Sequence, residues 1–103
     1  MRLYDLTEDA ENDLREILRY TLKQWGAPQV RRYQQTLVRK LEAIAHGEVA
    51  VRRFSGNLPD VFVTKCEHHY IFYITQARPR PLVIAFFHER QDIVARLADR
   101  LGD

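Results

Sequence analysis

Hydrophobic residues recur every three to four positions in two stretches near the start of the chain. The first set follows Thr7 and comprises Ala10, Leu14, Ile17, Leu18, Thr21, Leu22 and Trp25. The second set follows Ala27-Pro28 and comprises Val30, Tyr33, Leu37, Leu41, Ile44 and Ala45. This spacing puts each set on one face of an amphipathic helix. Gly26 separates the two stretches, so the pattern predicts two helices that double back as an antiparallel hairpin.

Local signals mark the ends of these helices. Thr7 is the expected N-cap, because acidic residues crowd the turn that follows it, at the positive end of the helix dipole. Pro28 is tolerated in the first turn of the second helix, and Gly47 is the expected stop. The short apolar piece before Thr7, residues 3–6, is predicted to be an N-terminal strand.

After Gly47 the pattern becomes strand-like, and β-branched and aromatic residues dominate. The predicted strands are residues 49–54, 61–67, 70–74 and 82–87. A turn-rich stretch covers 55–60, a tight turn lies near His68, and two prolines interrupt the chain at 78–81. Residues 70–74 are apolar on both faces, as in a central strand. Asp92 is the expected cap of a final helix with the apolar residues Ile93, Val94, Leu97 and Leu101.

This order of elements predicts an α+β fold. An N-terminal strand and the helix hairpin pack on a mainly antiparallel sheet, with the helices grouped on one side and a short C-terminal helix at the end. With 103 residues, of which 46% are hydrophobic, we expect one domain over residues 1–103. No apolar run is long enough to span a membrane, and residues 1–6 do not resemble a signal peptide. The single cysteine, Cys66, excludes an internal disulfide and favours the cytoplasm.

The formal net charge is only +2, but the charges are unevenly distributed. Residues 1–16 carry six acids and two arginines, whereas residues 17–81 carry eleven bases and four acids. Thirteen of the sixteen cations are arginine, whose planar guanidinium suits carboxylates, phosphates and stacked contacts. The basic middle segment favours an acidic partner, either protein or nucleic acid. Local pairing of these arginines with surface acids is the alternative.

Two clusters have residue types that carry chemistry. The first, Cys66, His68 and His69, could bind zinc. Adjacent strand residues point to opposite faces, however, and no second ligand cluster follows. We therefore interpret this segment as a surface turn, and we predict no metal and no cofactor.

The second cluster follows the last predicted strand, where His88 suits acid–base catalysis and Arg90 suits a phosphate. The residues that would complete a metal-free ribonuclease site are Tyr70, Tyr73, Arg52, Arg53 and Arg78. We favour the structural alternative, in which both tyrosines are half-buried in the sheet, Arg90 pairs with Asp92 and His88 only ends a strand. A nucleic-acid grip by residues 52–54 and 78–80 has weak support, because no known binding motif accompanies it. Glycine-rich phosphate loops and Gly-x-Ser-x-Gly motifs are also missing from the sequence.

Several short patterns occur together in a fixed order. The N-terminal pattern is Leu6-Thr7, Ala10, Asp13-Leu14, Ile17, Tyr20, Gly26, Tyr33, Leu37 and Leu41. The central one is the aromatic strand His69-Tyr70-Ile71-Phe72-Tyr73, and the closing one is His88-x-Arg90-x-Asp92 after an apolar strand. In this order and spacing, the chain resembles the ParE branch of the RelE/ParE toxin superfamily, the toxin half of bacterial type II toxin–antitoxin modules.

The resemblance implies a compact sheet with a helical hairpin, and a toxin that poisons DNA gyrase and stalls it on broken DNA. It further implies neutralisation by a ParD-like antitoxin that dimerises as a ribbon-helix-helix DNA binder and wraps the toxin with its C-terminal segment. We then expect a hetero-oligomer with the antitoxin, contact with operator DNA only through the antitoxin, and no enzymatic activity.

Candidate contact residues follow from this resemblance and from the basic segment. For gyrase we expect the closing signature, His88, Arg90 and Asp92, together with the final helix. For the antitoxin, the candidates are arginines of the basic segment: Arg31, Arg39, Arg52 and Arg53.

Two other functions remain open at this point. One is a RelE-like ribosome-dependent mRNA ribonuclease using His88 and Arg90. The chain has no tyrosine after Tyr73, where such nucleases have one near the C-terminus, and Glu89 places an anion where a phosphate would approach. The other is a non-toxic binding module whose basic segment docks an acidic peptide.

Overall fold

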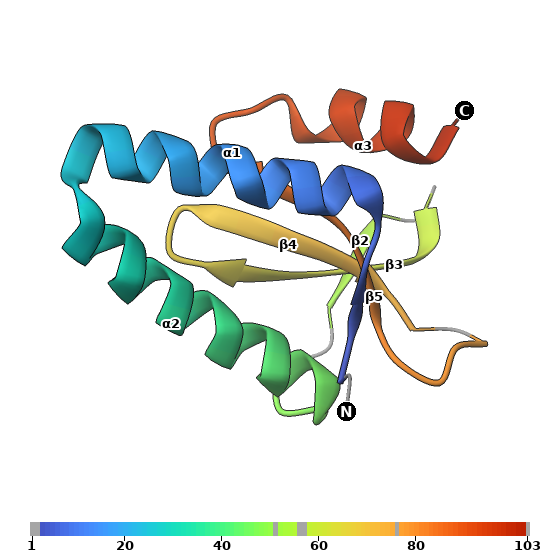
Figure 1. The fold of residues 1–103 in the computed structure, drawn as a ribbon. Helices are drawn as coiled ribbons and strands as arrows, with labels where there is room; N and C mark the ends of the chain where they lie inside the picture. The colour runs from blue at the N-terminus through green and yellow to red at the C-terminus, as the bar shows by residue number, and fades with distance from the viewer. Residues whose placement is uncertain (1–2, 51, 56–57, 76, 103) are drawn as a thin grey trace.

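The computed structural model of the chain describes residues 3–50, 52–55, 58–75 and 77–102. A short strand is followed by two long helices, a run of strands and a final helix (Figure 1). In chain order the elements are β1 (Asp5–Leu6), α1 (Glu8–Trp25), α2 (Ala27–Ala45), β2 (Arg53–Ser55), β3 (Leu58–Cys66), β4 (His69–Ile74), β5 (Leu82–His88) and α3 (Ile93–Gly102).

The strands form one sheet in the order β1-β5-β4-β3-β2. The pairs β2–β3, β3–β4 and β4–β5 are antiparallel, whereas β1 pairs parallel with β5. In Figure 1, α1 and α2 double back from the turn at Gly26, and α3 closes the chain. The predicted α+β fold, a helix hairpin on a mainly antiparallel sheet with a C-terminal helix, is confirmed.

The two faces of the sheet carry separate hydrophobic clusters. On β4, Ile71 and Tyr73 belong to the cluster under α1 and α2, and Phe72 between them belongs to the other cluster. Leu97 of α3 is fully buried in that second cluster. We call these two sides the hairpin face and the α3 face. The prediction that the helices group on one side is therefore wrong for α3, because strands that are apolar on both faces need cover on both.

A β-bulge in β5 decides which way the end of this strand faces. Phe72 pairs with Ala85, but its neighbour Tyr73 pairs with Val83, so Ile84 is the extra residue. Ile84 and Ala85 consequently both join the cluster on the α3 face, and Phe86 returns to the hairpin face. His88, two residues beyond Phe86, then also falls on the hairpin face.

The ends of the helix hairpin are built as the sequence predicts. The Thr7 hydroxyl accepts a hydrogen bond from the amide of Ala10 at 3.0 Å, which confirms the N-cap. Gly26 has φ +89° between the helices. Gly47 follows α2 with φ +69° in the left-handed region, where glycine is favoured. No helix in the described part of the chain is long and apolar enough to cross a membrane.

Strand boundaries differ more from the predictions. The predicted strand at 49–54 is strand only from Arg53, with Val51 outside the described residues, and Val49 packs against the hairpin-face cluster. The predicted turn at 55–60 is already β3 from Leu58 onward, and residues 56–57 lie outside the described part. β3 starts pairing with β4 only at Phe62, so Pro59 precedes the part of β3 that lies between two strands.

The far end of α1 is exposed, although the sequence places it on the buried stripe. Ala10 is fully buried, and Leu14, Ile17 and Leu18 pack against the core. By contrast, Leu22 is 53% exposed and Trp25 is 72% exposed. The apolar stripe therefore runs past the part of the sheet that it covers.

Polar groups close the outer edge of β5 where β1 stops. β1 pairs only with Leu82 and Val83. Beyond them, the amide of Phe86 donates to Asp13 Oδ2 at 3.0 Å, and Arg100 donates to the carbonyl of Ile84 at 2.9 Å. Arg100 also pairs with Asp13 at 2.8 Å. This cluster, which we call the edge clasp, joins α1, β5 and α3.

Candidate binding cleft

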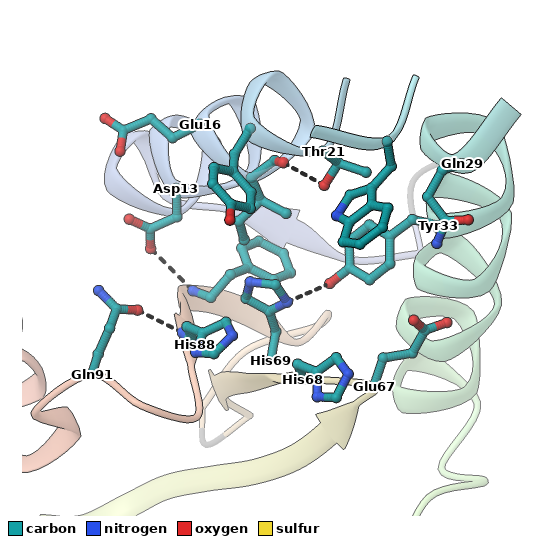
Figure 2. Close-up of a pocket in the computed structure, with 14 residues that line it drawn as sticks. Asp13, Glu16, Thr21, Gln29, Tyr33, Glu67, His68, His69, His88 and Gln91 are labelled. Carbon is teal, nitrogen blue, oxygen red and sulfur yellow. Dashed lines mark hydrogen bonds between the residues drawn. The ribbon is translucent and has the colours of Figure 1, made fainter. Parts of the chain in front are cut away.

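A cleft of about 530 Å³ opens on the hairpin face, where β3 turns into β4 and β5 ends. Its walls come from α1 and the start of α2, and its floor comes from the strand ends (Figure 2). Its lining residues are Asp13, Glu16, Ile17, Tyr20, Thr21, Trp25, Gln29, Tyr33, Glu67, His68, His69, Phe86, His88 and Gln91. We call it the hairpin cleft.

A phenol and an imidazole meet at the base of the hairpin cleft. The hydroxyl of Tyr33 on α2 lies 3.1 Å from Nδ1 of His69 on β4, as Figure 2 shows. Burial, with smaller contributions from the neighbouring imidazoles of His88 and His68, lowers the pKa of His69 to about 4. Burial also raises the pKa of Tyr33 well above its usual value. At neutral pH both groups are therefore uncharged.

Two more imidazoles, those of His68 and His88, lie near this pair. His88 packs edge-on against His69, with ring centroids 5.2 Å apart, and stacks near His68 at 6.3 Å. His68 Nδ1 lies 2.9 Å from Glu89, which also pairs with Lys65 at 2.8 Å. These two partners, first Lys65 and then His68, lower the pKa of Glu89 to about 2, so its carboxylate stays ionised.

The side chains with a formal charge that line the hairpin cleft are acidic. Asp13, Glu16 and Glu67 contribute carboxylates, and none of the described residues lining the cleft is lysine or arginine. A nuclease cleft needs cations to hold the phosphates of its substrate. An imidazole and a phenol are present here, but the guanidinium that would complete a phosphate-cleaving set does not line the cleft.

The structure separates the three residues predicted to contact gyrase. The His88 ring lies in the hairpin cleft, where its Nδ1 accepts from the backbone amide of Arg90 at 3.1 Å. Arg90 is exposed. Asp92 precedes α3, and its Oδ1 lies 3.4 Å from the amide of Ala95 in a long capping contact. Among the described residues Arg90 forms no ion pair with Asp92, so the pairing expected in the structural alternative is not seen.

A smaller groove of about 310 Å³ lies on the α3 face. It brings together two residues that the sequence assigns to different partners, Arg52 for the antitoxin and Asp92 for gyrase. Phe54, Tyr70 and Val94 contribute apolar surface beside them. We call it the α3 groove.

The other predicted antitoxin contacts lie elsewhere. Arg31 and Arg39 are exposed on α2, which covers the hairpin face. The guanidinium of Arg53 lies 5.6 Å from the ring centroid of Phe62, which packs on that same face. The four arginines therefore do not form one patch.

The residues considered for a ribonuclease site are not brought together. Tyr73 is only 4% exposed in the hairpin-face core, whereas Tyr70 packs on the α3 face. The expectation that both tyrosines are half-buried is thus wrong for Tyr73. Arg78 lies in the loop between β4 and β5, at the opposite end of β5 from His88. Those ends are about 20 Å apart for a strand of this length.

The predicted turn near His68 is confirmed. Glu67 and His68 link β3 to β4, and Cys66 and His69 pair as the residues that flank the turn. Glu67 adopts φ +56° there. Cys66 is buried and burial raises its thiol pKa, which makes it a poor metal ligand and nucleophile. Among the described residues no group of three His, Cys, Asp or Glu side chains is placed to hold a metal ion.

Sequence reasoning missed the central contact of the hairpin cleft. The sequence analysis places Tyr33 on an apolar stripe and in the family pattern, and His69 in a discarded metal site and at the start of an aromatic strand, but it does not connect the two. They are 36 residues apart, and their contact depends on how α2 packs across β4. The one available signal was a tyrosine on an otherwise aliphatic stripe, because a buried phenol usually finds a polar partner.

Comparison with known proteins agrees with this fold and places the chain in a family. A family model described as "ParE toxin of type II toxin-antitoxin system, parDE" matches residues 4–93. The Toxin ParE of Escherichia coli is 46% identical over 101 residues, which cover 98% of both chains. A solved structure described as "Chromosomal ParDE TA system from P. aeruginosa" superposes with a TM-score of 0.69 at 15% identity, over 82% of this chain and 92% of that one. The chain belongs to the ParE toxins of type II toxin–antitoxin systems.

Proposed function

We propose that this ParE toxin inhibits DNA gyrase in the cytoplasm and is neutralised by a ParD-like antitoxin. The observation that carries the proposal is the 46% identity to a ParE toxin over nearly the full length. The sequence patterns that resemble the gyrase-poisoning branch extend through the same region, from Leu6 to Asp92. A toxin of this kind acts by binding a protein and needs no catalytic group of its own.

The charges of the hairpin cleft support a protein target over an RNA target. Its lining carries three carboxylates and the neutral imidazole of His69, as described above. Glu89, next to His88, stays ionised because Lys65 and His68 bind it. An RNA phosphate approaching His88 would meet this anion. The runner-up function, mRNA cleavage through His88 and Arg90, therefore lacks electrostatic support here.

We propose that His88, Arg90 and Asp92 contact gyrase and that Arg90 contributes most of the binding energy among them. Its side chain is exposed and, among the described residues, takes part in no ion pair, so it can bind a partner without breaking an internal contact. Exposed arginines are frequent hot spots in protein interfaces. His88 and Asp92 flank it on the two faces of the sheet.

For neutralisation we propose that the C-terminal tail of the antitoxin lays apolar side chains in the α3 groove and pairs one acidic residue with Arg52, because Glu89 and Asp92 also line the groove and would repel a strongly acidic segment. Arg52 offers it a cation, and the apolar groove wall offers a surface on which a tail can fold. Because Asp92 lines the same groove, an antitoxin bound there covers part of the proposed gyrase surface. Arg31, Arg39 and Arg53 remain proposed contacts for the rest of the antitoxin. The complex is then a hetero-oligomer that reaches operator DNA through the antitoxin.

The gyrase proposal predicts a specific loss of inhibition in a supercoiling assay. Purified toxin should block supercoiling and accumulate cleaved plasmid, and Arg90→Ala should need about tenfold more protein for the same effect. Arg78→Ala is the matched control, because Arg78 is equally exposed but lies at the other end of β5. Full supercoiling at a large excess of folded toxin would contradict the proposal.

The antitoxin proposal predicts charge-dependent binding at the α3 groove. Arg52→Glu should weaken binding of the antitoxin's C-terminal segment about tenfold, because it replaces attraction by repulsion. Titration calorimetry with Arg78→Glu as a control of equal charge change measures the effect. Equal weakening by both variants would indicate a general charge effect and contradict a contact at Arg52.

A further inference from the structure

The rim of the hairpin cleft carries exposed aromatic rings. Tyr20 is 63% exposed and Trp25 is 72% exposed, and both line the cleft. Leaving an indole in water is unfavourable, and clustered exposed aromatics mark surfaces that contact another molecule. Their π faces carry partial negative charge, which attracts cations, and most strongly for tryptophan.

Two carboxylates of the cleft have no ion-pair partner in the part of the chain that the structure describes. Asp13 is paired with Arg100 in the edge clasp. Glu16 and Glu67 also line the cleft, and among the described residues neither forms an ion pair. Figure 2 shows them on opposite sides of the cleft, with Glu16 on α1 and Glu67 in the turn between β3 and β4. The Glu16 side chain extends outward from α1 (Figure 2), so it attracts an incoming cation at the outer rim, while Glu67 attracts it from the turn.

The other polar groups of the cleft do not offset this charge. His69 is neutral at physiological pH, and His68 faces Glu89. His88 accepts a backbone hydrogen bond through Nδ1, which requires that nitrogen to be unprotonated. On the rim, Gln29 accepts a hydrogen bond from Arg32, which is not itself a lining residue. The cleft is thus aromatic and anionic.

We propose that the hairpin cleft receives an arginine side chain from a partner protein. A guanidinium can stack flat on an aromatic ring and at the same time pair with a carboxylate, which an ammonium does less well. A cavity of about 530 Å³ holds one such side chain with room for the adjoining backbone. Phosphate and acidic peptides are repelled by Glu16 and Glu67. This proposal holds independently of which protein the toxin inhibits.

A titration with a short peptide tests the proposal on the intact toxin. The probe is acetyl-Gly-Arg-Gly-amide, and its neutral counterpart carries citrulline, which keeps the shape and removes the charge. Trp25 is the only tryptophan in the chain, so its fluorescence and its indole N–H resonance report on the rim alone. We expect saturable changes with a Kd of about 1 mM, typical of one side chain in an open cleft.

Charge variants separate a specific site from general attraction. Glu16→Gln combined with Glu67→Gln should raise the Kd about fivefold or more. The control variant combines Glu8→Gln with Glu11→Gln. These substitutions remove the same charge from exposed positions on α1 outside the cleft, and they should leave the Kd for the peptide unchanged. Circular dichroism confirms that each variant is folded. The proposal is overturned if citrulline binds as well as arginine, if both double variants behave alike, or if inorganic phosphate saturates the cleft instead.

Discussion

At the scale of single residues, the environment of His69 decides what the hairpin cleft can do. Its imidazole is packed between the Tyr33 hydroxyl and the ring of His88. Burial there favours the neutral ring, which is why its pKa falls to about 4. A histidine that stays neutral through the physiological range neither attracts phosphate nor repels an incoming cation. Its role at neutral pH is to form the floor of the cleft.

The lowered pKa of His69 predicts that acid destabilises the fold. The unfolded chain binds this proton at a pKa near 6.5 and the folded chain only near 4, so stability is lost as the pH falls between these values. Such a pKa difference corresponds to about 3 kcal/mol, and solvent screening at a partly exposed ring reduces it to roughly 1–2 kcal/mol. Urea unfolding of the toxin at several pH values measures this loss.

His69→Asn provides the control for this pH dependence. The variant is less stable at pH 7 but should lack most of the decline between pH 6.5 and 4. Glu89 has a separate effect on stability. Because its pKa falls from 4.5 to about 2 on folding, the stability that it contributes is lost only as the pH drops below about 4.5. Parallel pH curves for wild type and His69→Asn above pH 4.5 would show that the low pKa of His69 is not linked to folding.

At the scale of elements, the edge clasp fixes how the helices sit on the sheet. Arg100 from α3 pairs through two nitrogens with Asp13 of α1 and lies 5.0 Å from the ring centroid of Phe87. It also donates to the carbonyl of Ile84, which follows the two β5 residues that pair with β1. A helix on each face is thereby tied to the same strand, and α1 is held where its exposed end forms the wall of the hairpin cleft.

The edge clasp predicts a large effect of one arginine on stability. Arg100→Ala leaves the half-buried Asp13 without its cation and leaves the Ile84 carbonyl with only a long contact, at 3.5 Å, from the Thr7 hydroxyl, so it should cost about 2–3 kcal/mol of unfolding free energy. Arg96→Ala, an exposed arginine one turn earlier on α3, should cost less than about 0.5 kcal/mol. Denaturant unfolding compares the two, and equal small losses would show that the clasp contributes little.

At the scale of the whole molecule, the spacing of hydrophobic residues and the turn residues predict the features that depend on local sequence alone. The helix hairpin, the Thr7 cap, the stop at Gly47 and the turn at His68 follow from side-chain spacing and backbone preferences. The position of α3 does not, because a short apolar stripe fits either face of the sheet. The hairpin cleft depends on a β-bulge at Ile84 that turns His88 to the hairpin face, and on a packing contact between Tyr33 and His69. The bulge has no local sequence signal, and the contact has only the tyrosine on an otherwise aliphatic stripe.

The central claim is that the toxin acts on a protein and not on RNA. The most direct measurement is made in one culture shortly after the toxin is induced, with gyrase trapped on DNA and cleavage of translated messages quantified in the same cells. We expect DNA breaks covalently linked to gyrase, while messages stay intact in those early samples. Cleaved messages at ribosomes, with gyrase free of DNA, would contradict it.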